Sequence, residues 1–176
     1  MRAGFAVWIT GLPASGKSTV ATALARELST RGIDVAVLES DALRRIFTPD
    51  PRYSEEERDI FYGAMTHVGQ LLTEHGVPVI FDATANRRAY RDRARQHIPR
   101  FVEVYVDCPL DVCMNRDPKG IYHKAQQGEA TTVPGLQSAY EPPENPEVRV
   151  RGDREAPEMA ARRVVAILME KGYLSG

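Results

Sequence analysis

The sequence predicts an α/β protein in which a mostly parallel sheet of five strands lies between layers of helices. Three observations support this fold class. Short apolar runs of strand length alternate along the chain with longer segments of helical periodicity. The first apolar run leads through a glycine-containing turn into a helical segment, which is the order expected of a parallel α/β unit. One long stretch, residues 117–146, has no sustained period and interrupts the alternation.

Five segments have the length and composition of buried strands. The clearest is the segment from Phe5 to Thr10, because it is short and apolar and is followed by turn-forming residues. The last is the short segment from Val148 to Val150. The predicted strands are residues 5–10, 34–38, 77–81, 101–106 and 148–150.

The helical segments are marked by their periodicity and by their ends. In the first of them Val20, Leu24 and Leu28 recur at helical spacing. Ser54 and Glu57 have the spacing of a capping box at the start of the longest one. The predicted helices are residues 17–30, 54–74, 87–96, 109–116 and 156–171.

Length and charge limit the classes of function. We expect a single domain over residues 1–176. The net charge of −1, from 23 basic and 24 acidic residues, gives no overall attraction to nucleic acid or to an anionic membrane. No apolar run approaches the roughly 20 residues that span a bilayer, and Met1 to Thr10 reads as a strand and not as a signal peptide. We therefore expect a cytoplasmic protein in which Cys108 and Cys113 are reduced.

The segment from Gly11 to Ser18, GLPASGKS, matches the phosphate-loop pattern G-x-x-x-x-G-K-[ST] without a mismatch. Its glycines let successive backbone N–H groups face a phosphate, and the following helix adds its N-terminal dipole. Lys17 can reach the β- and γ-phosphates of ATP as a catalytic residue, and the hydroxyl of Ser18 can bind Mg²⁺. The sequence thus predicts a three-layer P-loop NTPase fold. The expected ATP-binding residues of the loop are Gly11, Leu12, Pro13, Ala14, Ser15, Gly16, Lys17, Ser18 and Thr19.

Kinases, regulatory GTPases and motor ATPases all carry such a loop. The short chain and the lack of an Asn-Lys-x-Asp tetrapeptide disfavour a GTPase. Residues 117–146 contain five prolines and three glycines, which suits a lid that closes over phosphates and excludes water. Arg116, Lys119 and Lys124 are candidate lid charges, and Arg116 is also a candidate to stack on the adenine of ATP. These features favour a kinase.

Polar side chains follow the second and third predicted strands, at the sheet edge where α/β proteins bind ligands. Asp41 is a candidate to accept the proton of an acceptor hydroxyl or to hold Mg²⁺ through water, and it also suits a helix N-cap. Arg44 follows one helical turn later and can pair with an acceptor phosphate or belong to a solvated basic face. Asp82 is a candidate for Mg²⁺ or for the acceptor, and Asn86 is a candidate cap of the next helix.

Four segments together resemble the adenylylsulfate kinases. They are residues 11–19, 104–112, 116–122 and 140–147, and the last of them, YEPPENPE, is far more specific than the phosphate loop. The resemblance runs over nearly the whole chain. It implies an ATP-dependent kinase that phosphorylates the 3′-hydroxyl of adenosine 5′-phosphosulfate (APS), giving PAPS and ADP in sulfate assimilation.

The resemblance also assigns roles to matching residues. It implies that Lys17 and Ser18 contact phosphate and Mg²⁺, that Asp41 is catalytic, and that Arg116 and Lys119 belong to the lid. The candidate contact of Arg116 with the adenine places it among the expected ATP-binding residues. Related kinases are often dimers, so a homodimer is a further expectation. The acceptor-binding residues that the resemblance implies are Asp41, Arg44, Tyr53 and Lys119.

The chain departs from the family pattern on the acceptor side. Residues 84–88 replace an Ile-Ser-Pro-Phe-Arg motif, so no serine stands there. Two alternatives therefore stay open, a kinase for another small hydroxyl or nucleotide-linked acceptor and a non-catalytic nucleotide-binding module. The departing positions are Ala42, Phe61, Gly63, Ala85 and Val133.

Overall fold

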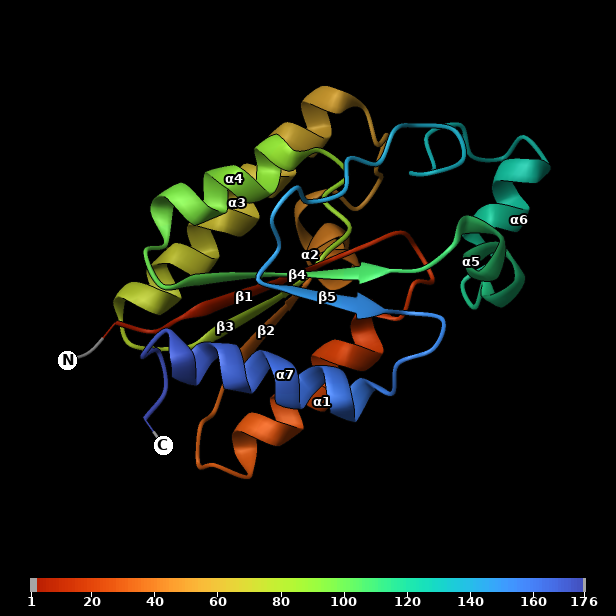
Figure 1. Cartoon of the computed structure of the whole chain (residues 1–176). Coiled ribbons are helices and arrows are strands. Elements are labelled where there is room, and N and C mark those ends of the chain that lie inside the picture. The colour runs from red at the N-terminus through yellow and green to blue at the C-terminus, as the bar shows by residue number, and fades with distance from the viewer. Residues whose placement is uncertain (1–2, 176) are drawn as a thin grey trace.

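The computed structural model describes residues 3–175 and shows one five-stranded sheet with helices on both faces (Figure 1). Residues 1, 2 and 176 of the expected domain lie outside the described residues. The strands are β1 (Ala6–Thr10), β2 (Ala36–Glu39), β3 (Val79–Asp82), β4 (Phe101–Asp107) and β5 (Val148–Arg151). The helices are α1 (Lys17–Ser29), α2 (Ser40–Phe47), α3 (Glu55–Glu74), α4 (Arg88–His97), α5 (Leu110–Arg116), α6 (Ile121–Gln126) and α7 (Pro157–Glu170).

The sheet confirms the predicted fold class. Its strand order is β2-β3-β1-β4-β5, and each neighbouring pair is parallel. The five expected strands and five expected helices all form, with small shifts at their ends. The helices α2 and α6 were not predicted, and α6 lies within residues 117–146, which were expected to be irregular.

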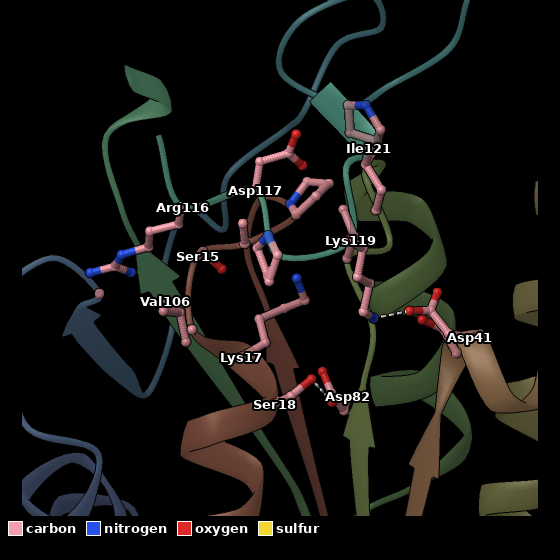
Figure 2. A pocket seen from close by; sticks show the side chains of 18 of the residues that line it. Ser15, Lys17, Ser18, Asp41, Asp82, Val106, Arg116, Asp117, Lys119 and Ile121 are labelled. Atoms are coloured by element: carbon pink, nitrogen blue, oxygen red, sulfur yellow. Dashed lines mark hydrogen bonds and ion pairs between the residues drawn. The ribbon is translucent and has the colours of Figure 1, made fainter. Parts of the chain in front are cut away.

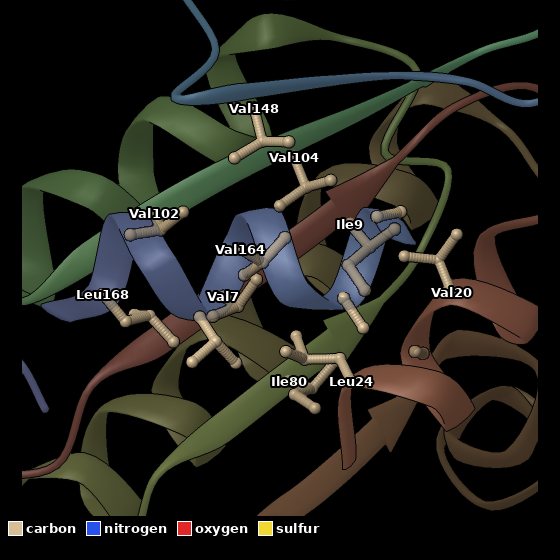
Figure 3. Close-up of a cluster of buried hydrophobic side chains, with 14 of the residues drawn as sticks. Val7, Ile9, Val20, Leu24, Ile80, Val102, Val104, Val148, Val164 and Leu168 are labelled. Carbon is tan, nitrogen blue, oxygen red and sulfur yellow. The ribbon is translucent and has the colours of Figure 1, made fainter. Parts of the chain in front are cut away.

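One core lies between the sheet and the pair of helices α1 and α7 (Figure 3). Val7 and Ile9 of β1 enter this core together with Val20 and Leu24 of α1 and Val164 of α7. The predicted helical spacing of α1 thus places its apolar face on the sheet.

The second core lies on the other face, under α3 and α4. Alternation along β1 sends Ala6 and Trp8 to this side. The indole of Trp8 stacks on Phe81, with 4.5 Å between the ring centroids. Gly69 of α3 approaches the same ring so closely that an added Cβ would lie 2.1 Å from Phe81 Cζ. Helix α3 therefore packs directly on β3 at this glycine.

The start of β4 brings both ends of the described chain together. Arg100 donates hydrogen bonds to the carbonyl oxygens of Ala3 and Tyr173. The chain ends in Figure 1 lie away from the tips of the strand arrows, where the polar residues that follow the strands gather. No helix among the described residues is long and apolar enough to cross a membrane.

Three capping expectations need correction. Ser54 caps α3 and accepts from Glu57 N, but the Glu57 carboxylate binds the N–H groups of Arg52 and Tyr53, whereas a full capping box would return it to Ser54. Asp41 lies in the first turn of α2, whose N-cap is Glu39.

Asn86 does not cap α4 either, because Arg87 holds that position. The amide of Asn86 instead donates to the carbonyl oxygen of Ala139, 3.1 Å away.

Candidate active site

A cleft of about 960 Å³ opens at the carboxyl edge of the sheet. Figure 2 shows the phosphate loop on one side of it, Asp41 on the other, and Arg116 to Ile121 above. The floor is formed where β1 and β3 end, because these central strands deliver the loop and Asp82 to the same place.

The phosphate loop has the curled backbone that its glycines predict. Gly16 has a φ of 105° and directly precedes α1, and Ala14 has a φ of 61°. Lys17 Nζ donates to the carbonyl oxygen of Leu12, 2.9 Å away. Burial lowers the pKa of Lys17, against the opposing charges of Asp82 and Asp41. The phosphate loop is thus already curled around the ammonium group of Lys17, which binds within the loop.

Most of the predicted ATP-binding residues line the cleft, but two do not. Residues 13–19 form its wall, whereas Gly11 is buried. Leu12 packs against a small apolar cluster that includes Cys113, Tyr122 and Val133. Ser15 Oγ is buried and has no hydrogen-bond partner among the described residues. An added Cβ on Gly152 would lie 2.4 Å from the Ser15 carbonyl oxygen, so Gly152 lets the loop sit tightly against the chain after β5.

Ser18 and Asp82 form the strongest candidate for the metal site. Ser18 Oγ donates to Asp82 Oδ2 at 2.6 Å, and Asp82 is only 5% exposed. Hydroxyl and carboxylate oxygens are the ligands that Mg²⁺ prefers, usually as one or two protein groups completed by phosphate and water. No group of three or more His, Cys, Asp or Glu residues that could hold a metal ion occurs within residues 3–175.

Asp41 and Lys119 face each other across the cleft and form an ion pair (Figure 2). Asp41 lies in the first turn of α2, and Lys119 lies between α5 and α6. The pair joins the wall of the cleft to the segment above it.

The predicted acceptor residues Arg44 and Tyr53 also line the cleft. Arg44 is 6% exposed, and its Cζ lies 4.0 Å from the ring centroid of Phe61 and 4.8 Å from that of Tyr53. Arg44 Nη1 reaches Glu57 Oε1 at 3.4 Å. Tyr53 is partly exposed and has a φ of 55°. Arg44 is thus a seated cation and does not belong to the solvated basic face that the sequence left open.

Arg58 is a further cation of this wall, and it was not singled out from the sequence. It is 7% exposed, lines the cleft and donates from Nη2 to the carbonyl oxygen of Thr132 at 2.8 Å. Burial lowers its pKa, although arginine remains charged. The available signal was a charged residue at the start of the apolar face of α3.

Arg44, Tyr53 and Arg58 form one side of the cleft, which we call the acceptor wall. Residues 117–138 touch both the phosphate loop and this wall. Tyr122 Oη donates to the carbonyl oxygen of Pro13 at 2.8 Å. Arg116 is exposed at the donor end of the cleft, near Val106 and Cys108. The apolar wall beside Arg116 includes Val106 and Val150 and suits a flat base.

Residues 139–147 form a second, firmly bound part of the same segment. Arg91 is 1% exposed and donates to the carboxylate of Glu103 and to the carbonyl oxygens of Ala85 and Glu141. Tyr140 Oη lies 2.9 Å from Thr10 Oγ1 at the end of β1. This part is fixed to the sheet edge and to α4.

Of the five positions at which the chain departs from the family pattern, only Val133 is among the described residues that line the cleft. Phe61 packs beneath Arg44, Ala85 is buried and donates its N–H to Tyr62 Oη, and Gly63 faces Arg93. Thr84 and Asn86, which belong to the replaced motif at residues 84–88, line the cleft as well. The surface of the cleft therefore departs from the family pattern at Thr84, Asn86 and Val133.

The fold and the cleft define the class of this protein as a P-loop kinase, a phosphotransferase that uses ATP. Comparison with known proteins gives the family. The family model for adenylylsulphate kinase matches residues 3–151. The chain therefore belongs to the adenylylsulphate kinase family, which confirms the resemblance found in the sequence.

Individual relatives agree with the family model. The adenylyl-sulfate kinase of Halothermothrix orenii is 40% identical over 98% of this chain and 93% of its own length. The structure of the Mycobacterium tuberculosis APS kinase in complex with AMPPNP and APS is 37% identical, with a TM-score of 0.90 over 96% of this chain and 99% of that one. A hexameric APS kinase from Thiobacillus denitrificans has a TM-score of 0.73 and 28% identity over 99% of this chain but 30% of that one.

Proposed function

We propose that the protein transfers the γ-phosphate of ATP to the 3′-hydroxyl of APS, giving PAPS and ADP in cytoplasmic sulfate assimilation. The observation that carries the proposal is that one cleft holds both the phosphate loop and a wall of seated cations, Arg44 and Arg58, with Asp41 between them. The phosphate loop suits the donor, and the arginines suit the phosphosulfate of the acceptor. The complex of the M. tuberculosis kinase with AMPPNP and APS supports this pair of substrates.

The proposed transfer needs positioning and charge stabilisation more than covalent protein chemistry. The 3′-oxygen of the acceptor bonds to the γ-phosphorus while the bond from that phosphorus to the β–γ bridging oxygen breaks, and ADP leaves. Asp41 accepts the proton of the 3′-hydroxyl. Lys17 and the N-terminus of α1 stabilise the charge that moves onto the leaving oxygens.

Mg²⁺ is the proposed cofactor, and the donor atoms present fit it. Ser18 and Asp82 would hold the ion, and Asp41 would approach it through water. When bound, the ion neutralises charge on the β- and γ-phosphates. The protein groups also keep their own roles, because Asp82 fixes the hydroxyl of Ser18 at the mouth of the phosphate loop.

We further propose one domain whose residues 117–146 act as a lid. Its outer part carries Lys119 and follows directly on Arg116 at the end of α5, while its inner part is bound through Arg91. A homodimer is proposed as well, because α2 exposes Ile46 and Phe47 and α3 exposes Ile60. Light scattering of the purified protein tests the dimer, and a monomeric mass contradicts it.

The acceptor proposal is tested with purified protein, ATP, Mg²⁺ and APS. We expect ADP and PAPS in equal amounts. ATP binding without PAPS formation would exclude APS, and ADP release with another hydroxyl acceptor would then support the alternative kinase.

Two substitutions test the proposed roles in transfer. We expect Asp41→Ala to lose at least about a hundredfold in kcat, because general base catalysis contributes about 10²–10⁴-fold. Lys17→Ala should lose tight MgATP binding, which calorimetry measures. Full turnover by the first variant, or unchanged binding by the second, contradicts the role of that residue.

A further inference from the structure

Glu57, which does not line the cleft, supports two residues of the acceptor wall, Arg44 and Tyr53. The carboxylate of Glu57 receives three donors from two different segments. Arg52 N lies 2.8 Å from Glu57 Oε2, Tyr53 N lies 3.2 Å from Oε1, and Arg44 Nη1 lies 3.4 Å from Oε1. Glu57 does not line the cleft, so it acts on an acceptor only through these partners.

The local geometry distinguishes this carboxylate from an ordinary helix cap. Ser54 already caps α3, and Glu57 N donates to the Ser54 hydroxyl at 3.1 Å. In a capping box the N3 carboxylate returns to the N-cap N–H, but Glu57 reaches past it to the two residues before. Its carboxylate is therefore committed to the loop between α2 and α3.

That loop holds Tyr53 in a conformation that needs support. A φ of 55° lies in the left-handed region, which residues other than glycine adopt only when surrounding structure fixes them. The hydrogen bonds from Arg52 N and Tyr53 N to Glu57 fix the backbone that leads into this angle. They thereby place the Tyr53 ring 4.8 Å from the Arg44 guanidinium.

Arg44 is seated from below by the same helix. Phe61 follows Glu57 by four residues, so both side chains lie on one face of α3. The ring of Phe61 lies under the Arg44 guanidinium and Glu57 lies beside it, with only 7% of the Arg44 side chain exposed. Helix α3 thus carries a seat for Arg44 made of one ring and one carboxylate.

From this arrangement we infer that Glu57 is a positioning residue for the acceptor, a role that rests on the proposed function. It sets Arg44 and Tyr53 at a fixed separation before the acceptor arrives. Loss of the carboxylate would weaken acceptor binding while leaving the phosphate loop, on the other side of the cleft, unchanged.

The test compares Glu57→Ala, Glu57→Gln and the matched control Glu56→Ala, which removes an exposed carboxylate from the same helical turn. We expect Glu57→Ala to raise KM for APS about tenfold or more, with kcat within about threefold and the Kd for MgATP within about twofold. The Gln variant keeps only one acceptor oxygen, while Arg52 N and Tyr53 N bind different oxygens of Glu57. Its KM should therefore lie between those of the parent protein and Glu57→Ala, and the control should match the parent protein. An unchanged KM in Glu57→Ala, or a parallel rise in the Kd for MgATP, overturns the inference.

Amide hydrogen exchange supplies a measurement that needs no acceptor. We expect the amides of Arg52 and Tyr53 to exchange about tenfold faster in Glu57→Ala and unchanged in Glu56→Ala. Unchanged exchange in Glu57→Ala overturns the inference. If the parent protein makes no PAPS, the proposed function fails, and the exchange rates then decide whether Glu57 fixes the backbone of Arg52 and Tyr53.

Discussion

Asp82 is the residue whose environment most constrains the chemistry of the cleft. It ends strand β3, which lies next to the central strand β1, is nearly buried and accepts from Ser18 Oγ. Asp41 stands on the opposite side and is paired with Lys119. Burial lowers the pKa of Lys119, but the hydrogen bond and charge of Asp41 outweigh this effect and raise it above 10.5. The ammonium group of Lys119 therefore stays charged at neutral pH. Asp41 thus has a charged partner, whereas Asp82 has the hydroxyl of Ser18, and the two carboxylates have different proposed roles.

The first prediction concerns the proposed metal site. We expect Asp82→Asn to raise the Mg²⁺ concentration for half-maximal activity about tenfold, because an amide oxygen replaces a carboxylate beside Ser18. A magnesium titration at saturating ATP measures this value. Asp107→Asn is the control, because Asp107 also ends a strand but pairs with Arg149. An unchanged magnesium requirement in Asp82→Asn would exclude Asp82 from the site.

At the scale of elements, helix α3 makes close contacts near its N-terminus and in its C-terminal half. Near its start Glu57 and Phe61 support Arg44, and near its end Gly69 lies against the Phe81 ring. The helix therefore couples the acceptor wall to the second core. Its two interior glycines, Gly63 and Gly69, allow this packing to be tested on one element.

We expect Gly69→Ala to destabilise the protein by about 1–3 kcal/mol, because its new Cβ would lie 2.1 Å from an atom of the buried Phe81 ring. Gly63→Ala is the matched control. Its Cβ would meet only the tip of the Arg93 side chain, and alanine is the better helix former by about 1 kcal/mol. Urea unfolding measures both, and an equal effect of the two substitutions would contradict the close approach at Gly69.

Elements with long apolar patterns could be predicted from the sequence, and elements stabilised by distant contacts could not. The buried runs of β1 and β4 and the periodicity of α1 are local signals. Helix α6 has only six residues and starts where the Asp117 carboxylate accepts from Tyr122 N and His123 N. Helix α2 has eight residues and only one buried side chain, that of Arg44. Neither is long enough to show a period.

The site could be predicted only in part for the same reason. The phosphate loop is contiguous in sequence, so Lys17 and Ser18 were found at once. Arg58 and Glu57 act through residues that are distant in the chain or through the loop before them. Their local signals, a charge at the start of an apolar helix face and a capping spacing, do not reveal these partners. The burial of Phe61 and Ala85 behind the wall likewise depends on tertiary packing.

At the scale of the whole molecule, Glu147 joins several elements just before β5. Arg95 of α4 donates to both of its carboxylate oxygens at 2.6 and 2.9 Å, and Glu103 N of β4 donates at 2.7 Å. Lys171 lies 3.8 Å away at the end of α7. Burial alone would raise the pKa of Glu147, but the hydrogen bonds from Arg95 and Glu103 N outweigh it and lower the pKa below 4.5.

Because the folded pKa of Glu147 is lowered, its contribution to stability is present above pH 4.5 and is lost as the pH falls through the folded value. We expect Glu147→Gln to lower the free energy of unfolding at pH 7 by about 1–3 kcal/mol. The difference from the parent protein should shrink on acidification below pH 4.5. Glu144→Gln removes an exposed carboxylate and should change little at either pH. A Glu147→Gln deficit that is constant with pH would exclude the linkage.

The clamp at Arg100 has a practical consequence for all of these experiments. It gathers both ends of the described chain at the amino end of β4, whereas the cleft opens where the strands finish. A surface tether attached near Ala3 or Tyr173 would thus lie on the side opposite the cleft. The protein can therefore be immobilised through the surface near the amino end of β4, which leaves the cleft open to the solution.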